Sequence, residues 1–219
     1  MVKFNKKEYI QSIKSLHPAD QADSIENLNL KDQTSVLKTS TKDLHPDFIA
    51  YLREETRDGI LNLIPKKQLI NLIKFLDLDD AVEILSEFET KDLVNTLSNL
   101  GQLQRSRIEE NLKYPEDSAG RIMNRDFLAV KSTLTVGNLI DELRTSRRGP
   151  KDFYNVFIVD ENNTPIGYIP SGRILRSKRS KKLKDMMLEN VHLIKSNETV
   201  EDIAYTSRQY GLVSATVVS

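Results

Sequence analysis

The feature that most constrains the fold of this chain is an internal repeat in its second half. The stretch VKSTLTVGNLIDEL, which begins at Val130, aligns with IKSNETVEDIAYTS, which begins at Ile194, 64 positions later. Further on, VFIVD of the first copy matches ATVVS of the second, so the first copy carries about five extra residues between these segments. Because similar sequence repeated at a fixed period forms the same structural unit each time, two copies of one unit are predicted.

The pattern of the first copy predicts an α/β unit. FLAV, at residues 127–130, is typical of a short strand, and Thr135 is suited to cap the helix that follows it. NVFIVDENNTPIGYIP then contains two apolar runs separated by a turn-rich segment, which indicates a hairpin. The first copy continues through this hairpin, whereas the second ends at Ser219. We therefore expect this chain to be a fragment of a longer protein, with an incomplete second copy.

The first half of the chain has the periodicity of short helices. Apolar residues recur at helical spacing after Pro18, after Pro65 and after the acidic phrase DLDD. The phrases LHPADQADSIENL and LDLDDAVEILSEF share a weak similarity of the kind that stacked short helices produce. Thr90 is predicted to cap a further helix that stops at Gly101. The predicted fold is multidomain, with an all-helical domain of short stacked helices followed by the α/β repeat.

Composition excludes several classes of protein. The chain has no cysteine, which removes disulfides, thiolate catalysis and cysteine-bound zinc and fits a reducing, cytosolic compartment. No signal peptide and no sufficiently long apolar window for a membrane span is present. The net charge of zero hides an asymmetry, because residues 1–117 carry a net −5 and residues 118–219 a net +5. The two halves are therefore expected to attract each other or to meet different partners, unless the uneven distribution arose by chance.

No residue pattern supports catalysis, so we predict no catalytic residues and no enzyme. His17, His45 and His192 are scattered, and neither a nucleophile motif nor a zinc-protease motif is present. The eight glycines form no phosphate-binding loop, so no cofactor-binding residues are predicted either. His17 and His45 each precede a proline, and such HP pairs more plausibly open helices.

The strongest chemical cluster is acidic. Asp77, Asp79, Asp80 and Glu83 lie close together, and Glu87 continues the row one helical turn further on. Carboxylates on one exposed helix face suit a hard cation that prefers oxygen ligands. The alternative is that acids in a first turn only complement the helix dipole, and spacing alone favours it slightly.

A basic run, from Arg173 to Lys184, contains seven Lys or Arg in twelve residues. It could meet an anionic membrane surface, nucleotide phosphates or RNA, or it could be a solvated connector between the two copies. Because it lacks interleaved aromatic residues and the chain is not basic overall, a nucleic-acid partner is not predicted.

Three sequence features together carry a family resemblance that runs from about His17 to the end: the repeat, the junction before it, and two phrases of the helical half. The repeat resembles a cystathionine-β-synthase (CBS) domain pair. The junction YPEDSAGRIMNRDFLAV, with the phrases LHPADQADSIENL and LDLDDAVEIL before it, looks like the link between the helical domain and the CBS pair of MgtE-type magnesium transporters. The resemblance implies a helical domain at 1–117, a first CBS unit at 118–182 and an incomplete second unit at 183–219.

The resemblance also implies a function. It suggests a cytosolic Mg²⁺ sensor that dimerises through its CBS region and gates a transmembrane pore lying C-terminal in the same polypeptide. Mg²⁺ would bind between the domains, on Asp79 and Glu83 from the helical domain and Glu201 from the second CBS unit. Two alternatives remain open, a nucleotide-binding CBS energy sensor and a helical scaffold or adaptor.

The same resemblance predicts poor binding of adenine nucleotides. Arg173 falls at or next to the position where nucleotide-binding CBS pairs have an aspartate for the ribose, and arginine cannot accept hydroxyl protons. Leu212 occupies a position where the family has an aromatic residue against adenine. A second aromatic position holds Asn155, although the adjacent Tyr154 could substitute for it.

Overall fold

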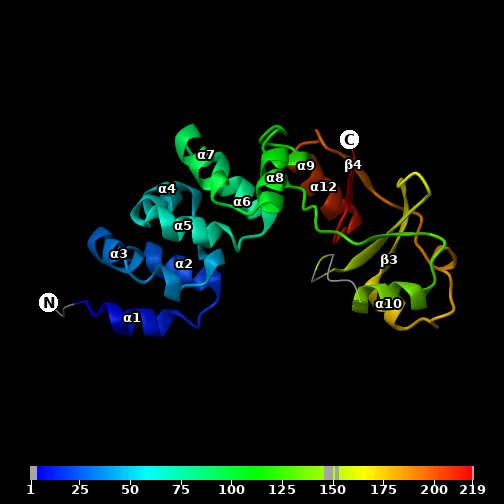
Figure 1. Ribbon diagram of the computed structural model, residues 1–219, viewed down its shortest axis with the longest axis horizontal. Coiled ribbons are helices and arrows are strands. Elements are labelled where there is room, and N and C mark those ends of the chain that lie inside the picture. The colour runs from blue at the N-terminus through cyan, green and yellow to red at the C-terminus, as the bar shows by residue number, and fades with distance from the viewer. Residues whose placement is uncertain (1–3, 146–149, 151–152, 219) are drawn as a thin grey trace. The chain divides into compact units, whose positions relative to one another are not determined.

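The computed structural model describes residues 4–145, 150 and 153–218 and divides the chain between Glu109 and Glu110 into two compact units. None of the helices in these residues has the length and apolar character needed to cross a membrane. The first unit is helical, and its helix pairs α2–α3, α4–α5 and α6–α7 succeed one another (Figure 1). Its elements are α1 (Lys6–Ile13), α2 (Pro18–Glu26), α3 (Leu30–Leu37), the 3₁₀ turns η1 (Thr41–Asp43) and η2 (Pro46–Ile49), α4 (Glu54–Leu63), α5 (Lys66–Ile73), α6 (Leu78–Ser86) and α7 (Thr90–Ser98), with α8 (Gln102–Asn111) at the division.

Local sequence explains where these helices begin. His17 occupies the N-cap of α2, where its Nδ1 accepts a hydrogen bond of 3.2 Å from the amide of Ala19. His45 does the same at η2, accepting from the amide of Asp47 at 3.3 Å. The prediction that the HP pairs open helices is thus confirmed, because the proline supplies a helical φ and the imidazole an acceptor.

The predicted cap at Thr90 is wrong by one residue. Glu89 occupies the N-cap of α7, and its carbonyl already accepts from the amide of Leu93 at 2.9 Å, so Thr90 is the first helical residue. The helix also ends earlier than predicted, at Ser98, with Asn99 as its C-cap rather than at Gly101.

The first unit is held by an apolar core and by polar links between successive helix pairs. Large, fully buried side chains include Ile25, Leu37, Phe48, Ile49, Leu52, Ile73, Ile84 and Leu85. Three ion pairs join residues 26 or 27 positions apart, namely Glu26 with Arg53, Arg57 with Glu83 and Lys66 with Asp92. A recurrent link of this spacing is what a stack of similar helix pairs produces, because corresponding residues of neighbouring pairs come into contact.

The second unit contains the repeat. The first copy folds as β1 (Ala129–Lys131), α10 (Val136–Thr145), β2 (Asn155–Val159), β3 (Pro165–Pro170) and α11 (Ser171–Leu175), and the second as β4 (Leu193–Lys195), α12 (Val200–Tyr210) and β5 (Thr216–Val218); α9 (Ala119–Ile122) and the 3₁₀ turn η3 (Leu183–Asp185) precede the two copies. β1 pairs in parallel with β2, which pairs antiparallel with β3, and β4 pairs in parallel with β5. The predicted strand, helix and hairpin are all present, around a core that includes Val136, Leu139, Ile158 and Ile169.

Strand register confirms the repeat position by position. In the first copy Val130 pairs with Ile158, and in the second Ile194 pairs with Val217. Val130 and Ile194 are 64 positions apart, whereas Ile158 and Val217 are 59 apart, so the five extra residues lie between helix and second strand as predicted. Both helices are capped by a threonine. The predicted Thr135 accepts from the amide of Asn138, and its equivalent Thr199 accepts from the amide of Asp202, each at 3.2 Å.

The segment before each copy caps the helix of the other copy. The amide of Val136, the first residue of α10, donates to the carbonyl of Lys181 at 2.9 Å. The amide of Val200, the first residue of α12, donates to the Asp117 carboxylate at 3.2 Å, and Asp117 lies 64 positions before Lys181. Two further backbone hydrogen bonds join the copies in the same way. The amide of Leu183 donates to the carbonyl of Leu134 at 2.9 Å, and the amide of Ala119 donates to the carbonyl of Glu198 at 2.8 Å.

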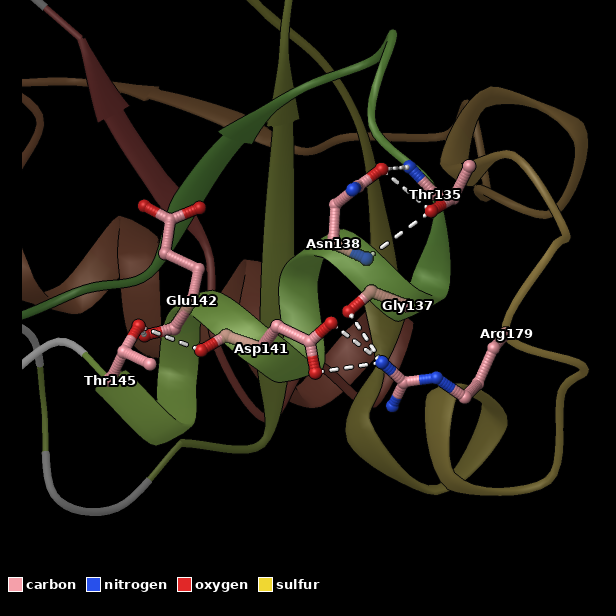
Figure 2. A network of polar contacts seen from close by, with 7 residues as sticks. All are labelled: Thr135, Gly137, Asn138, Asp141, Glu142, Thr145 and Arg179. Carbon is pink, nitrogen blue, oxygen red and sulfur yellow. Dashed lines mark hydrogen bonds and ion pairs between the residues drawn. The ribbon is translucent and has the colours of Figure 1, made fainter.

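The basic run is attached to α10, although its seven Lys and Arg residues are all exposed. The carbonyl of Arg179 accepts from the amide of Gly137 at 2.8 Å, and its guanidinium donates to both carboxylate oxygens of Asp141, at 2.7 and 2.6 Å. Figure 2 shows Arg179 reaching this carboxylate beside the first turn of the helix, which Thr135 caps. The bridge lies on the surface, so it is worth under about 1 kcal/mol, and the backbone contacts contribute more to the attachment.

Candidate functional site

The acidic row lies at the start of α6. Asp77 is its N-cap residue but makes no capping hydrogen bond with its side chain, and Asp79 and Asp80 lie in the first turn. Asp77, Asp79 and Glu83 are exposed, whereas Asp80 is half-buried. The row therefore presents several carboxylates to solvent at the positive end of a helix, as the sequence predicted.

These carboxylates repel one another. Burial, followed by the charges of Asp79 and Asp77, raises the pKa of Asp80 to about 6. The pKa of Asp79 is also raised, by desolvation and by the charges of Asp77 and Glu83, although hydrogen bonds from nearby backbone amides oppose this. Near neutral pH the row therefore carries crowded negative charge that a bound cation would relieve.

Glu83 has a partner that the sequence did not reveal. Its Oε1 accepts from Nη1 of Arg57 on α4 at 2.6 Å, and the same Nη1 donates to Glu87 Oε1 at 3.1 Å. Arg57 is only 6% exposed, whereas the Glu83 side chain is 61% exposed. Burial lowers the pKa of Arg57, but its bonds and charge contacts with Glu83 and Glu87 outweigh this and leave it above its ordinary value.

Glu201, the third predicted metal ligand, lies in the first turn of α12 in the second unit and is exposed. Asp202 beside it is engaged with Thr199, whose hydroxyl donates to its carboxylate at 2.8 Å. Asp117 lies at the same helix end through its bond to the amide of Val200. Sequence reasoning missed Asp117, although the 64-residue offset that pairs it with Lys181 could have indicated its capping role.

The donor set fits a hard divalent cation, because all three predicted ligands are exposed carboxylates with oxygen donors. The structure places Asp79 and Glu83 one turn apart on α6, with Glu201 on a different element. Among the described residues, no group of three or more His, Asp or Glu side chains is arranged to hold a metal ion by itself. An ion bound to α6 would therefore have few protein ligands and would retain several waters.

A cavity of about 500 Å³ lies in the second unit, lined by residues of both copies. Its lining includes Tyr154, Asn155 and Leu212, three positions that the family resemblance connected with adenine binding. His192 and Tyr210, which the sequence did not suggest, add an aromatic pair with ring centroids 4.4 Å apart. Its lining in the described chain contains no Asp, Glu, Lys or Arg.

Arg173 does not line this cavity. It lies in a second hollow with Ser177, Lys181 and Asp185, where its guanidinium donates to the carbonyl of Met186 at 3.3 Å. The structure therefore does not bring Arg173 together with Tyr154, Asn155 and Leu212 at one cavity.

Fold and site together define a helical domain joined to a CBS-type α/β region. Residues 16–117 match the family model of the MgtE intracellular N domain, and residues 119–180 match that of the CBS domain. With both models matched in this order, the chain carries an MgtE intracellular N domain followed by a CBS domain, and the predicted fold class is confirmed. The boundaries predicted at 117 and 182 stay predictions.

Curated relatives and solved structures agree with this assignment. The chain is 21% identical to "Magnesium transporter MgtE" of Bacillus subtilis, over 97% of its own length and 47% of the relative. It is 22% identical to the protein of the same name from Thermus thermophilus, over 84% and 48%. The chain thus spans about half the length of these relatives.

The fold is that of two solved structures. One is described as the cytosolic domain of the Mg²⁺ channel MgtE in complex with ATP, with a TM-score of 0.83, 20% identity and coverage of 98% of this chain and 88% of that one. The other is the soluble part of a magnesium transporter, with a TM-score of 0.79, 21% identity and coverage of 98% and 86%.

Proposed function

We propose that this chain is a Mg²⁺-sensing regulatory module of a magnesium transporter or channel, working on the cytosolic side of the membrane. The observation that carries the proposal is the crowded carboxylate row of α6, in which burial and, after it, the charges of neighbouring carboxylates raise the pKa values of Asp79 and Asp80. The relatives, which are magnesium transporters, supply the identity of the cation. The module would act by binding and not by catalysis.

In this proposal Asp79 and Glu83 hold Mg²⁺ from the helical unit, and Glu201 contributes from α12. The ion would supply positive charge that offsets the repulsion within the row. Binding would change the state of a transmembrane pore in the same polypeptide, and the module would work as a homodimer through its CBS region. With few carboxylates and retained water, the affinity is expected to be on the order of millimolar.

A calorimetric Mg²⁺ titration followed by small-angle scattering tests this function. Replacing Asp79→Asn and Glu83→Gln together should remove most of the heat of binding and most of the metal-induced change in scattering. Asp20→Asn with Asp23→Asn is the matched control, because it removes two exposed carboxylates from α2 and should leave the titration nearly unchanged. If the α6 double variant titrates like the parent chain, the site assignment is wrong.

A nucleotide sensor is the second candidate function. The aromatic lining of the 500 Å³ cavity and the ATP complex of the similar cytosolic domain favour it. The uncharged lining argues against it, because it offers no carboxylate to a ribose and no cation to a phosphate.

A further inference from the structure

Arg57 is a buried cation that holds one of the carboxylates assigned to the metal. Its guanidinium contacts Glu83 and Glu87, which lie one turn apart along α6 and its C-cap. Nη2 also donates to the carbonyl of Leu52 at 3.3 Å, which ties the guanidinium to the segment before α4. A cation that binds Glu83 must therefore compete with a positive charge that belongs to the protein itself.

Moving Glu83 from Arg57 to a metal ion would lower the stability of the fold if Arg57 had no other counter-ion. A buried charge that loses its only counter-ion is strongly destabilising. Glu87 removes this difficulty, because it already accepts from the same Nη1 at 3.1 Å and its side chain is less exposed, at 28% against 61% for Glu83. The Nε–H of Arg57, buried and without an acceptor among the described residues, leaves a further donor for a carboxylate.

We propose that Arg57 and Glu87 form a carboxylate relay that sets the Mg²⁺ response of this chain: when Glu83 turns to the metal, Glu87 keeps Arg57 paired. Arg57 and Glu87 are positioning residues in this scheme and do not touch the ion. The relay rests on the function proposed above. It makes metal binding an exchange of partners, in which Arg57 lowers the affinity of Glu83 for the cation and Glu87 limits that loss.

The test compares two substitutions that each remove one negative charge near Arg57. Glu87→Gln removes the standby partner. Asp58→Asn removes an exposed carboxylate that neighbours Arg57 in the sequence. The charge of Asp58 acts on Glu87, but among the described residues no ion pair joins Asp58 to Arg57. Simple loss of charge predicts that both substitutions weaken Mg²⁺ binding about equally. The relay predicts about a threefold to tenfold weaker affinity for Glu87→Gln and less than twofold for Asp58→Asn.

A second readout follows Arg57 directly. The guanidinium ¹H–¹⁵N signal of Arg57 should shift as Mg²⁺ saturates the parent chain while staying protected from solvent exchange, because Glu87 retains it. In the Glu87→Gln chain the signal should shift only as the weaker site fills, at about threefold to tenfold higher Mg²⁺ concentrations, and it should lose its protection from solvent exchange as it shifts. Neither substitution touches the apolar core, and unfolding curves of both variants check that they remain folded.

The outcomes separate the relay from the function it rests on. If the Asp79/Glu83 double variant loses Mg²⁺ binding but Glu87→Gln and Asp58→Asn are equivalent, the relay is wrong and the sensing site stands. An Arg57 signal that does not respond while the parent binds Mg²⁺ also overturns the relay. If the double variant binds like the parent, the metal site fails and the relay fails with it.

Discussion

At the scale of single residues, Glu26 shows how a buried charge can organise a helical stack. Its side chain, at the end of α2, is fully covered. One carboxylate oxygen accepts from the amide of Arg53 at 2.9 Å and from the hydroxyl of Thr56, and the other accepts from Arg53 Nε at 2.8 Å. Glu26 thus supplies the N-terminal cap that Arg53, the N-cap residue of α4, cannot provide with its own side chain.

Replacing Glu26→Gln should therefore lower the free energy of unfolding by about 2 kcal/mol at pH 7. Burial raises the pKa of Glu26, but the bonds from Thr56 and Arg53 and the charge of Arg53 leave it below its ordinary value of 4.5. A lowered pKa gives stability that is present above pH 4.5 and lost as the pH falls through the folded-state pKa. Urea unfolding at pH 7, 5 and 3 should show the difference in free energy of unfolding between parent and variant closing at pH 3. Asp23→Asn, an exposed control on α2, should stay within about 0.5 kcal/mol of the parent.

At the scale of elements, the junction between α8 and β1 is held by a buried polar side chain, that of Asn111. Asn111 is fully buried, donates to the carbonyls of Arg121 and Met123, at 3.3 and 3.0 Å, and accepts from Arg125 Nε at 3.0 Å. The family resemblance rested on this junction, and the hydrogen bonds of Asn111 to its backbone and to Arg125 give a physical reason for part of its unusual sequence. The chain turns here with buried backbone groups that need defined partners.

Gly120 is the position at which the junction tolerates no side chain. A Cβ there would lie 2.3 Å from the ring of Tyr114, so Gly120→Ala should cost about 1–3 kcal/mol of stability. Gly59→Ala is the matched substitution, because Gly59 lies inside α4 with open space around its Cα and should gain about 0.5–1 kcal/mol in helix propensity. Chemical unfolding of the two variants measures the difference, and an unchanged midpoint for Gly120→Ala would contradict the packing described here.

At the scale of the whole molecule, the proposed Mg²⁺ sensor and the second candidate, a nucleotide sensor, differ in the ligand that they bind. We expect adenine nucleotides to bind weakly, because the described cavity lining carries no charged group and the basic run from Arg173 to Lys184 attracts phosphates without reading the base. ATP and GTP should give equal signals at low salt, and both signals should vanish near 0.15 M salt, where the screening length is about 8 Å. Calorimetry at both salt concentrations decides the matter. Saturable micromolar ATP binding at 0.15 M salt with preference over GTP would place the energy sensor first.

Much of the fold could be predicted from the sequence because its signals are local. The 64-residue offset and its drop to 59 predicted which segments of the two copies correspond, and HP and Thr capping predicted where several helices begin. The acidic row could be found for the same reason, since Asp79 and Glu83 lie one helical turn apart. Thr90 was misplaced by one residue because a cap depends on which carbonyl first accepts a helical bond, and several neighbouring residues could fill that role.

The sequence by itself thus determined the order of the units, the repeat and the position of the acidic row. Only the tertiary structure decided that Glu83 is paired with Arg57, that Asp117 caps the helix of the distant second copy, and that His192 and Tyr210 share a cavity. The physical reason is separation along the chain. A contact between residues 18, 26 or 83 positions apart forms only when packed elements bring the two side chains together.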